Sequence, residues 1–331
     1  MQQKVVLLGA TGQTGKSVLE ALLAEPQSFS VDALIRPASA PKAAVEQLRA
    51  RGVGIRVAEP TGPVDELAAA LQGADVVIST IGASGQLDQI PLVTAAKQAG
   101  VKRFVPCAFI TVAPPGGAML LRDEAKQVYQ HMFQLYLPYT IIDIGYWHQI
   151  SFPLVPSGRF DAANAIPQSQ TIYAGGTAPN LLTDLRDVGR YVARIIKDPR
   201  TLNKYVVTYS DVLSQNEIFA MAEEVSGENI VKRDYISAEE ITTQRKRAVA
   251  SHEANPADAM ARIQRLVQDY AYSKYVRKDN TPEAAKYLGY LDANELYPDF
   301  KPIRFRDFLG DLLQGKIERP YQNVEFSVMK K

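Results

Sequence analysis

The chain has 331 residues, of which 46% are hydrophobic, and its formal net charge is +1 at pH 7. This composition is typical of a fully globular protein with one large core or two domains. The near-neutral charge, without a dominant basic run, argues against nucleic acid or an anionic membrane surface as a partner. Cys107 is the only cysteine, which excludes an intrachain disulfide and favours a reducing compartment. No signal peptide fits before the first predicted strand and no apolar stretch is long enough for a bilayer, so we expect a cytoplasmic protein.

Strands and helices are predicted to alternate along the first 150 residues. Strands are predicted at Val5–Leu8, Val31–Ile35, Gly54–Ala58, Ala74–Gly82, Lys102–Phe109 and Pro138–Gly145, and helices before Pro26 and at Ala43–Arg51, Val64–Gln72 and Ile90–Gln98. This alternation predicts an α/β fold with a Rossmann-type doubly wound parallel sheet. Near Phe152 the sequence becomes proline-rich and irregular, and beyond it the helical segments are more polar and tyrosines are frequent. This change predicts a second, smaller α/β domain. We therefore expect a nucleotide-binding domain over 1–155, with part of 180–210 as a candidate completion, and a substrate domain over 156–331.

Three glycines within seven positions follow the first predicted strand, in the segment GATGQTGKSV. Glycine is favoured where the backbone turns sharply or approaches another group closely. A strand, a glycine turn and a helix direct free backbone N–H groups and the positive helix end at a phosphate. The residues predicted to hold the phosphates are Gly9, Thr11, Gly12, Gln13, Thr14 and Gly15. A bare strand-to-helix turn without a nucleotide is the alternative.

The end of the second predicted strand indicates which dinucleotide binds. A site selective for NADH usually places an acidic side chain there, whereas this chain has Arg36, because the strand continues past Asp32. The planar guanidinium matches a 2′-phosphate, and Lys42 is a candidate for a second positive contact. The residues therefore favour NADPH, while solvated side chains are the alternative for Arg36 and Lys42.

Ligands of such sheets bind outside the carboxyl ends of the strands. This rule selects Thr80, Ile81, Gly82, Cys107, Ala108, Phe109 and Gly145 for the cofactor, and Phe109, Tyr146, Trp147 and His148 for the substrate. Aromatic groups beside a nicotinamide favour a flat, apolar ligand. A core position between the two domains is the alternative for Trp147, and a small buried cysteine is the alternative for Cys107.

Seven segments occur in the order and spacing of the isoflavone reductase-like, or NmrA-like, group of atypical short-chain dehydrogenases: GATGQTGKSV, DVVISTIG, VKRFVPCAF, LPYTIIDIG, DPRTLNK, LSQNEI and ELYPDFK. The chain resembles this family over nearly its whole length, and its segment from Asp123 to Pro153 is similar to the fungal branch. The resemblance implies NADPH-dependent hydride transfer to a small aromatic or conjugated metabolite, which could be phenylpropanoid-, isoflavone- or polyketide-like. The chain departs from the plant reductases at Phe109 and Ile110, so their substrates are not carried over.

The helix before the sixth strand carries the predicted catalytic residue. Apolar residues recur at helical spacing and predict a buried face: Leu121, Ala125, Val128, Met132 and Leu135. Lys126 lies beside this face, aligned with Arg122 and Tyr129. The resemblance implies that a lysine on this helix moves the proton that accompanies hydride transfer, so Lys126, buried beside Arg122, is the prediction, and Tyr129 is the alternative donor. The chain departs from the family in two ways: the family spacing counted back from Pro138 falls on Ala125, and Arg122 replaces the tyrosine that precedes the lysine by four residues in ordinary short-chain dehydrogenases. A solvated Lys126 is the alternative.

Other patterns carry less weight. Tyr270 and Lys274 spell YxxxK, the short-chain dehydrogenase signature, but they lie far beyond the sheet and are interpreted as a chance match. Three histidines, at 131, 148 and 252, are too scattered to predict a metal site. The rival functions are an NADPH-binding redox sensor without turnover and a cofactor-bound dehydratase or isomerase. A homodimer is one option that the sequence leaves open.

Overall fold

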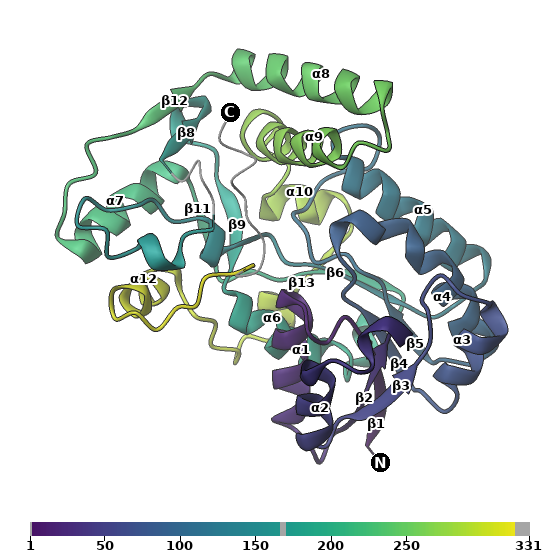
Figure 1. Cartoon of the computed structure of the whole chain (residues 1–331). Helices are drawn as coiled ribbons and strands as arrows, with labels where there is room; N and C mark the ends of the chain where they lie inside the picture. The colour runs from purple at the N-terminus through teal and green to yellow at the C-terminus, as the bar shows by residue number, and fades with distance from the viewer. Residues whose placement is uncertain (1, 166–169, 322–331) are drawn as a thin grey trace.

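The computed structural model describes residues 2–165 and 170–321. Strand β1 (Gln3–Leu8) lies at the centre of a five-stranded parallel sheet with the order β3-β2-β1-β4-β5 (Figure 1). The other strands are β2 (Phe29–Ile35), β3 (Gly54–Val57), β4 (Val76–Ser79) and β5 (Arg103–Val105). The strand order reverses between β1 and β4, which is the point where doubly wound sheets bind their ligands. The predicted Rossmann-type fold is confirmed.

Alternate side chains of β1 enter two cores, one on each face of the sheet, because successive residues of a strand point to opposite faces. Val5 and Leu7 pack with α1 (Gln13–Leu23) and α2 (Ala43–Ala50). Val6 and Leu8 pack on the other face with α3 (Val64–Leu71), α4 (Gln89–Gln98) and α5 (Leu120–Gln134). The sheet therefore has the continuous apolar strands of a parallel sheet that is covered on both sides.

Later segments of the chain extend this sheet. Strand β6 (Thr140–Asp143) lies beside β5 through a parallel bridge between Phe104 and Tyr139, and β10 (Lys204–Val207) and β13 (Leu291–Asp292) follow in parallel. Helix α6 (Leu185–Ile195) packs on α1, where the Gly189 backbone N–H donates to Ser17 Oγ at 2.9 Å. After β6 the chain leaves the nucleotide-binding sheet, and it returns to it with α6, β10 and β13.

The remaining elements form a second region at the other end of the molecule (Figure 1). Its strands are β7 (Tyr146–Trp147), β9 (Asn180–Thr183) and β11 (Asp211–Leu213) in one sheet, and β8 (Thr171–Tyr173) paired with β12 (Asp234–Ile236). Its helices are α7 (Gln215–Ser226), α8 (Ala238–Ala254), α9 (Ala259–Ala271) and α12 (Phe305–Leu313), with a π-helix at Tyr272–Arg277. Two further helices, α10 (Pro282–Tyr287) and α11 (Ala293–Leu296), pack beside β13 at the nucleotide-binding sheet. Short 3₁₀ turns occur at Pro37–Ser39, Ala83–Asp88, His148–Ile150, Asp161–Ala163, Ala174–Gly176 and Pro199–Thr201.

Aromatic side chains dominate the core of this second region. Phe152, Phe160, Phe219, Phe305 and Phe308 are buried together. Among the described residues, no helix is long and apolar enough to cross a membrane.

Candidate active site

The predicted glycine turn connects β1 to α1 in a tightly packed arrangement. Gly9 has a φ of +84°, and a Cβ there would lie 2.6 Å from the Thr80 carbonyl oxygen. A Cβ on Gly15 would lie only 2.0 Å from the Gly9 carbonyl oxygen. Thr80 also donates its hydroxyl to the Leu8 carbonyl at 2.7 Å, which joins the ends of β1 and β4. The first and third glycines are therefore required by the backbone itself.

The N-terminus of α1 fits the phosphates of a dinucleotide. Gly12 is its N-cap residue and no side chain caps the helix, so the first backbone N–H groups lack the usual side-chain acceptor. Gly12, Gln13 and Thr14 line a cavity at this point. Unpaired N–H groups and the positive end of the helix dipole together favour an anion.

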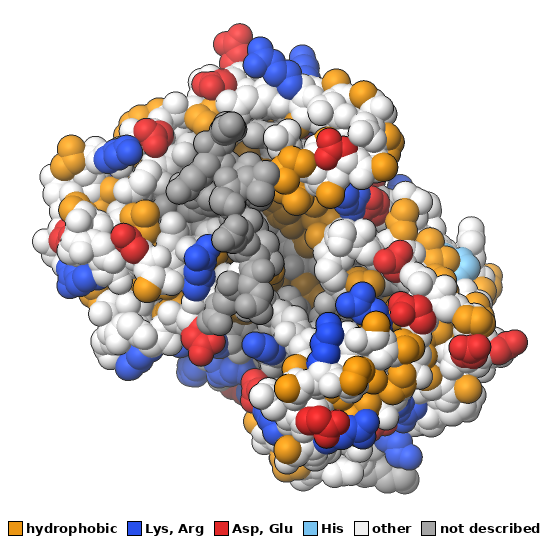
Figure 2. Space-filling model, in the orientation of Figure 1, with side chains coloured by type: hydrophobic (Ala, Val, Ile, Leu, Met, Phe, Trp, Pro, Cys, Tyr) orange, Lys and Arg blue, Asp and Glu red, His pale blue; other side chains and the backbone are white. Residues whose placement is uncertain are grey.

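A cavity of about 630 Å³ lies between the nucleotide-binding sheet and the second region. Hydrophobic side chains line the right-hand side of the hollow in the middle of the face shown in Figure 2. Of the predicted cofactor residues, those that line the cavity are Gly12, Gln13, Thr14, Thr80, Ile81, Gly82, Cys107, Ala108, Phe109 and Gly145. The carboxyl ends of β1, β4, β5 and β6 thus meet at one cavity, and its volume is within the range of ordinary ligand pockets.

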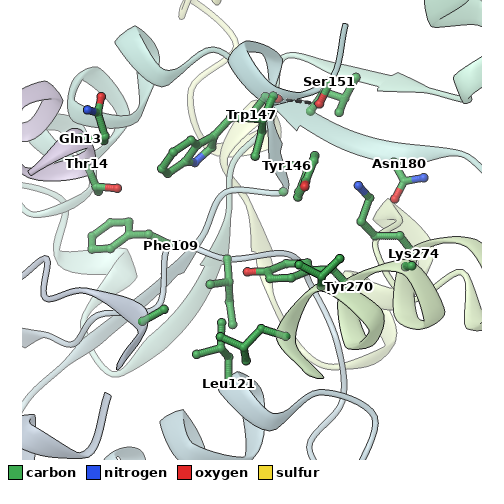
Figure 3. Close-up of a pocket in the computed structure, with 18 of the residues that line it drawn as sticks. Gln13, Thr14, Phe109, Leu121, Tyr146, Trp147, Ser151, Asn180, Tyr270 and Lys274 are labelled. Carbon is green, nitrogen blue, oxygen red and sulfur yellow. Dashed lines mark hydrogen bonds between the residues drawn. The ribbon is translucent and has the colours of Figure 1, made fainter. Parts of the chain in front are cut away.

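Aromatic side chains form the wall opposite the sheet (Figure 3). Tyr146 and Trp147 line the cavity, as do Tyr173, Tyr270 and Tyr275. Tyr173 and Tyr275 stack with ring centroids 4.9 Å apart, while Tyr146 and Tyr270 lie 5.8 Å apart. Burial raises the pKa of the Tyr146 and Tyr270 hydroxyls, so both remain protonated hydrogen-bond donors at neutral pH.

Lys274 belongs to this aromatic wall. Its side chain is 4% exposed, and its Nζ lies 3.2 Å from the ring centroid of Tyr146 and 4.8 Å from that of Tyr275. Burial lowers the pKa of the Lys274 amine to about 7. The interpretation of the YxxxK pattern as chance gave no reason to expect Tyr270 and Lys274 at the cavity, yet α9 and the π-helix bring both there.

The predicted position of Lys126 is wrong, because its side chain is exposed and does not line the cavity. Arg122 is buried instead, and its Nη2 donates to Asp143 at 2.6 Å, while Asp143 also accepts from Tyr290 at 2.5 Å. The guanidinium is therefore held by β6 and does not face Lys126. The predicted buried face of α5 is confirmed at Leu121, Ala125, Val128 and Met132, whereas Leu135, the C-cap residue, is half-buried.

Tyr129 lies in the core behind the cavity rather than in its wall. The side chain is 2% exposed and packs edge-on against Tyr205, with ring centroids 6.1 Å apart. Burial raises the pKa of its hydroxyl, which has no hydrogen-bond partner among the described residues. Tyr129 therefore does not line the cavity.

His148 is also a core residue, although the sequence placed it beside the substrate. It is fully buried, its Nε2 lies 2.9 Å from Ser210 Oγ, and its ring packs edge-on against Phe305. Two carboxylates, Asp184 and Asp211, lie 3.7 Å from its ring nitrogens. His148 joins β7 to α12 and does not line the cavity.

The two predicted phosphate-binding cations lie outside the cavity. Arg36 and Lys42 are exposed, and neither side chain forms a hydrogen bond or ion pair within the described part of the chain. Arg36 directly follows β2, whereas Asp32 is occupied by an ion pair with Arg56 at 2.6 Å. Both cations are therefore free to meet a ligand. Thr11 is exposed, and Gly9, like Gly15, shapes the turn without lining the cavity.

Cys107 lines the cavity but is not an activated thiol. Burial raises its pKa to about 12, and its Sγ donates to the Ile81 carbonyl at 3.1 Å. Within residues 2–165 and 170–321, no group of three or more His, Cys, Asp or Glu side chains is placed to hold a metal ion.

Comparison with known proteins gives a consistent picture. The model of the NmrA-like family matches residues 1–309. Asnovolin J 5′,6′-dehydrogenase of Aspergillus novofumigatus is 41% identical over 315 residues, which cover 94% of this chain and 95% of that protein. Phenylcoumaran benzylic ether reductase TP7 of Nicotiana tabacum is 28% identical over 325 residues, with 93% and 98% covered.

Solved structures share the fold. The binary complex of leucoanthocyanidin reductase with NADPH, from Vitis vinifera, has a TM-score of 0.76 at 22% identity and covers 94% of this chain and 99% of its own. The structure of AtPrR2 with NADP⁺ and (+)-pinoresinol has a TM-score of 0.73 at 22% identity, with the same coverage.

Proposed function

This chain belongs to the NmrA-like family, and from that premise we propose that it is an NADPH-dependent oxidoreductase acting on a small aromatic or conjugated metabolite. The observation that carries the proposal is a single cavity with two unlike walls. One wall is the backbone of the glycine turn between β1 and α1, and the other is a cluster of aromatic side chains. A cofactor and a flat substrate held by these walls would meet inside the cavity.

The chain's own residues account for cofactor binding. Backbone N–H groups at Gly12, Gln13 and Thr14 would hold the diphosphate at the N-terminus of α1. Arg36 would hold the 2′-phosphate, because its guanidinium follows β2 and has no competing partner among the described residues. When bound, NADPH supplies the hydride. The relative of known structure that was crystallised with NADPH has the same fold.

The aromatic wall favours a flat and largely apolar substrate. Phe109 projects from the sheet side, and Trp147 with the tyrosines Tyr146 and Tyr270 projects from the opposite side (Figure 3). Their buried hydroxyls would donate hydrogen bonds to carbonyl or phenol oxygens of the substrate, while the apolar lining excludes water. Phenylpropanoid-like or polyketide-derived metabolites fit this description, and relatives are named for asnovolin J, phenylcoumaran and pinoresinol.

The direction of the reaction follows from the cofactor ratio rather than from the cavity. One relative is named a dehydrogenase and others are named reductases. The same residues serve hydride transfer in both directions, because forward and reverse reactions share one transition state. Reduction by NADPH is the direction we propose for a cell that keeps this cofactor reduced.

Calorimetric titration with NADPH and NADH, followed by a panel of enones, quinones and aromatic ketones, tests the proposal. We expect NADPH to bind at least about 10-fold more tightly than NADH, as one charged hydrogen bond to the 2′-phosphate provides. We also expect NADPH oxidation with at least one member of the panel. Tight NADPH binding without turnover of any member would contradict an enzyme and favour a cofactor sensor.

A further inference from the structure

We propose that Lys274, on the π-helix after α9, is the residue that exchanges a proton with the substrate in the cavity. This inference rests on the proposed oxidoreductase function and names the acid-base group of the same site. It departs from the sequence-based prediction, which assigned that role to Lys126 on α5.

The first support is position. Lys274 lines the cavity together with Tyr146, Tyr270 and Tyr275, and its side chain extends from the π-helix toward Tyr146 (Figure 3). Lysine is rarely buried to this extent without a carboxylate partner, yet within the described residues Lys274 has no ion pair. A buried amine of this kind is costly for stability and is therefore a candidate functional group.

The second support is the set of groups around the amine. The rings that lie nearest the amine are the neutral phenols of Tyr146, on β7, and Tyr275, on the same π-helix. Tyr270 of α9 and Tyr173 of β8 pack against these two rings in turn. The nearby carboxylates are occupied elsewhere: Asp269 pairs with Arg245 at 2.8 Å, and Asp279 accepts from Ser273 and Arg277. From α8, the Arg245 guanidinium lies over the Tyr272 ring rather than beside Lys274. Among residues 2–165 and 170–321, no neighbouring negative charge holds the amine protonated, and burial brings its pKa to about 7.

A group with a pKa near neutrality is suited to move a proton in either direction. In reduction, the substrate receives a hydride at one atom of a C=C or C=O bond, and the electron pair of that π bond moves to the other atom. Lys274 donates a proton to that second atom, so its N–H bond breaks and a neutral amine remains. A proton from solvent then restores the ammonium. In oxidation, the neutral amine would accept the proton while the oxidised cofactor would accept the hydride and become reduced.

Lys274→Met tests this role because methionine fills a similar volume without an amine. Lys286→Met is the matched control, since Lys286 is an exposed lysine on α10. We expect turnover of a substrate found in the panel to fall about 10²–10⁴-fold in Lys274→Met, the usual contribution of a general acid, with NADPH affinity changed less than about threefold. Lys274→Arg keeps a positive charge that does not titrate near neutrality, so it should not restore turnover.

A second measurement needs neither substrate nor cofactor. Because the folded-state pKa lies near 7 and a free lysine has 10.5, the unfolded chain binds more protons between these values, so the free energy of unfolding rises with pH there. The slope of the free energy of unfolding against pH should therefore decrease in Lys274→Met by the amount that corresponds to about one proton. The slope should be unchanged in Lys286→Met. The reduction rate of the parent protein should also fall as pH rises through about 7, an inflection that Lys274→Met lacks.

The outcomes separate the two proposals. Absence of NADPH binding, or of turnover with any substrate, defeats the proposed function and this inference with it. Turnover by the parent protein with normal turnover in Lys274→Met leaves the function standing and overturns the role of Lys274. Restored turnover in Lys274→Arg, or an unchanged pH dependence of unfolding in Lys274→Met, likewise overturns it.

Discussion

The two walls of the cavity are built from different parts of the chain and in different ways. The nucleotide side, at the ends of β1 and β4, consists of backbone held so closely that a Cβ at Gly9 or Gly15 would overlap its neighbours. The aromatic side, from β7, β8, α9 and the π-helix, consists of side chains that stack on one another. Because the nucleotide side is built from backbone, substitutions of side chains leave the kind of ligand that it binds unchanged. On the aromatic side, substitutions can change which ligand fits. The contrast explains how one fold can keep its cofactor while its substrates differ.

The largest expected effect comes from a change to the backbone wall. In Gly15→Ala, the new methyl group would meet the Gly9 carbonyl oxygen at 2.0 Å, so the turn must open. We expect the free energy of unfolding to fall by about 3 kcal/mol. Thermal and urea denaturation measure this fall. Gly310→Ala, in α12 with open space around it, is the control and should be neutral or slightly stabilising. A Gly15→Ala protein as stable as the parent would show that the turn is looser than described.

The next effect concerns cofactor selectivity. Arg36→Ala should weaken NADPH binding by about 1.5–3 kcal/mol, the range of a lost charged hydrogen bond, and leave NADH binding nearly unchanged. Titration of both cofactors measures the difference, with Arg49→Ala, at an exposed position of α2, as the control. An equal loss of both affinities would assign Arg36 a structural role instead.

The smallest expected effect concerns the lysine of α5. Lys126 is exposed and lies outside the cavity, so Lys126→Met should change turnover by less than about twofold. Steady-state kinetics on the substrate used for Lys274→Met provide the comparison. A loss of about 10²-fold or more in Lys126→Met would restore the role predicted from the sequence.

The sequence predicted the backbone wall far better than the aromatic wall, for a physical reason. Gly9, Gly12 and Gly15 and the apolar strand before them are local signals, and local signals determine a turn between neighbouring elements. Tyr270 and Lys274 are separated from β1 and β4 by more than a hundred residues, and only the packing of α9 brings them to the ends of those strands. The YxxxK spacing was a visible signal, but nothing local indicated that this helix faces the cavity.

Errors on α5 and β7 have a related origin. The helical period correctly identified the buried face of α5, but it could not show that Asp143 draws Arg122 inward and leaves Lys126 in solvent. The rule that ligands bind beyond the carboxyl ends of the strands placed Tyr146 and His148 at the cavity, but it could not show that His148 turns into the core beside Ser210. Pairing between distant polar groups decides such positions, and it has no local sequence pattern.

A crystal structure with NADP⁺ tests most directly whether the two walls serve one reaction. We expect the diphosphate at the N–H groups of Gly12–Thr14, the 2′-phosphate at Arg36, and the nicotinamide in the cavity with one face open toward Tyr146 and Lys274. A nicotinamide ring covered on both faces by side chains, with no space left for a substrate, would contradict the account.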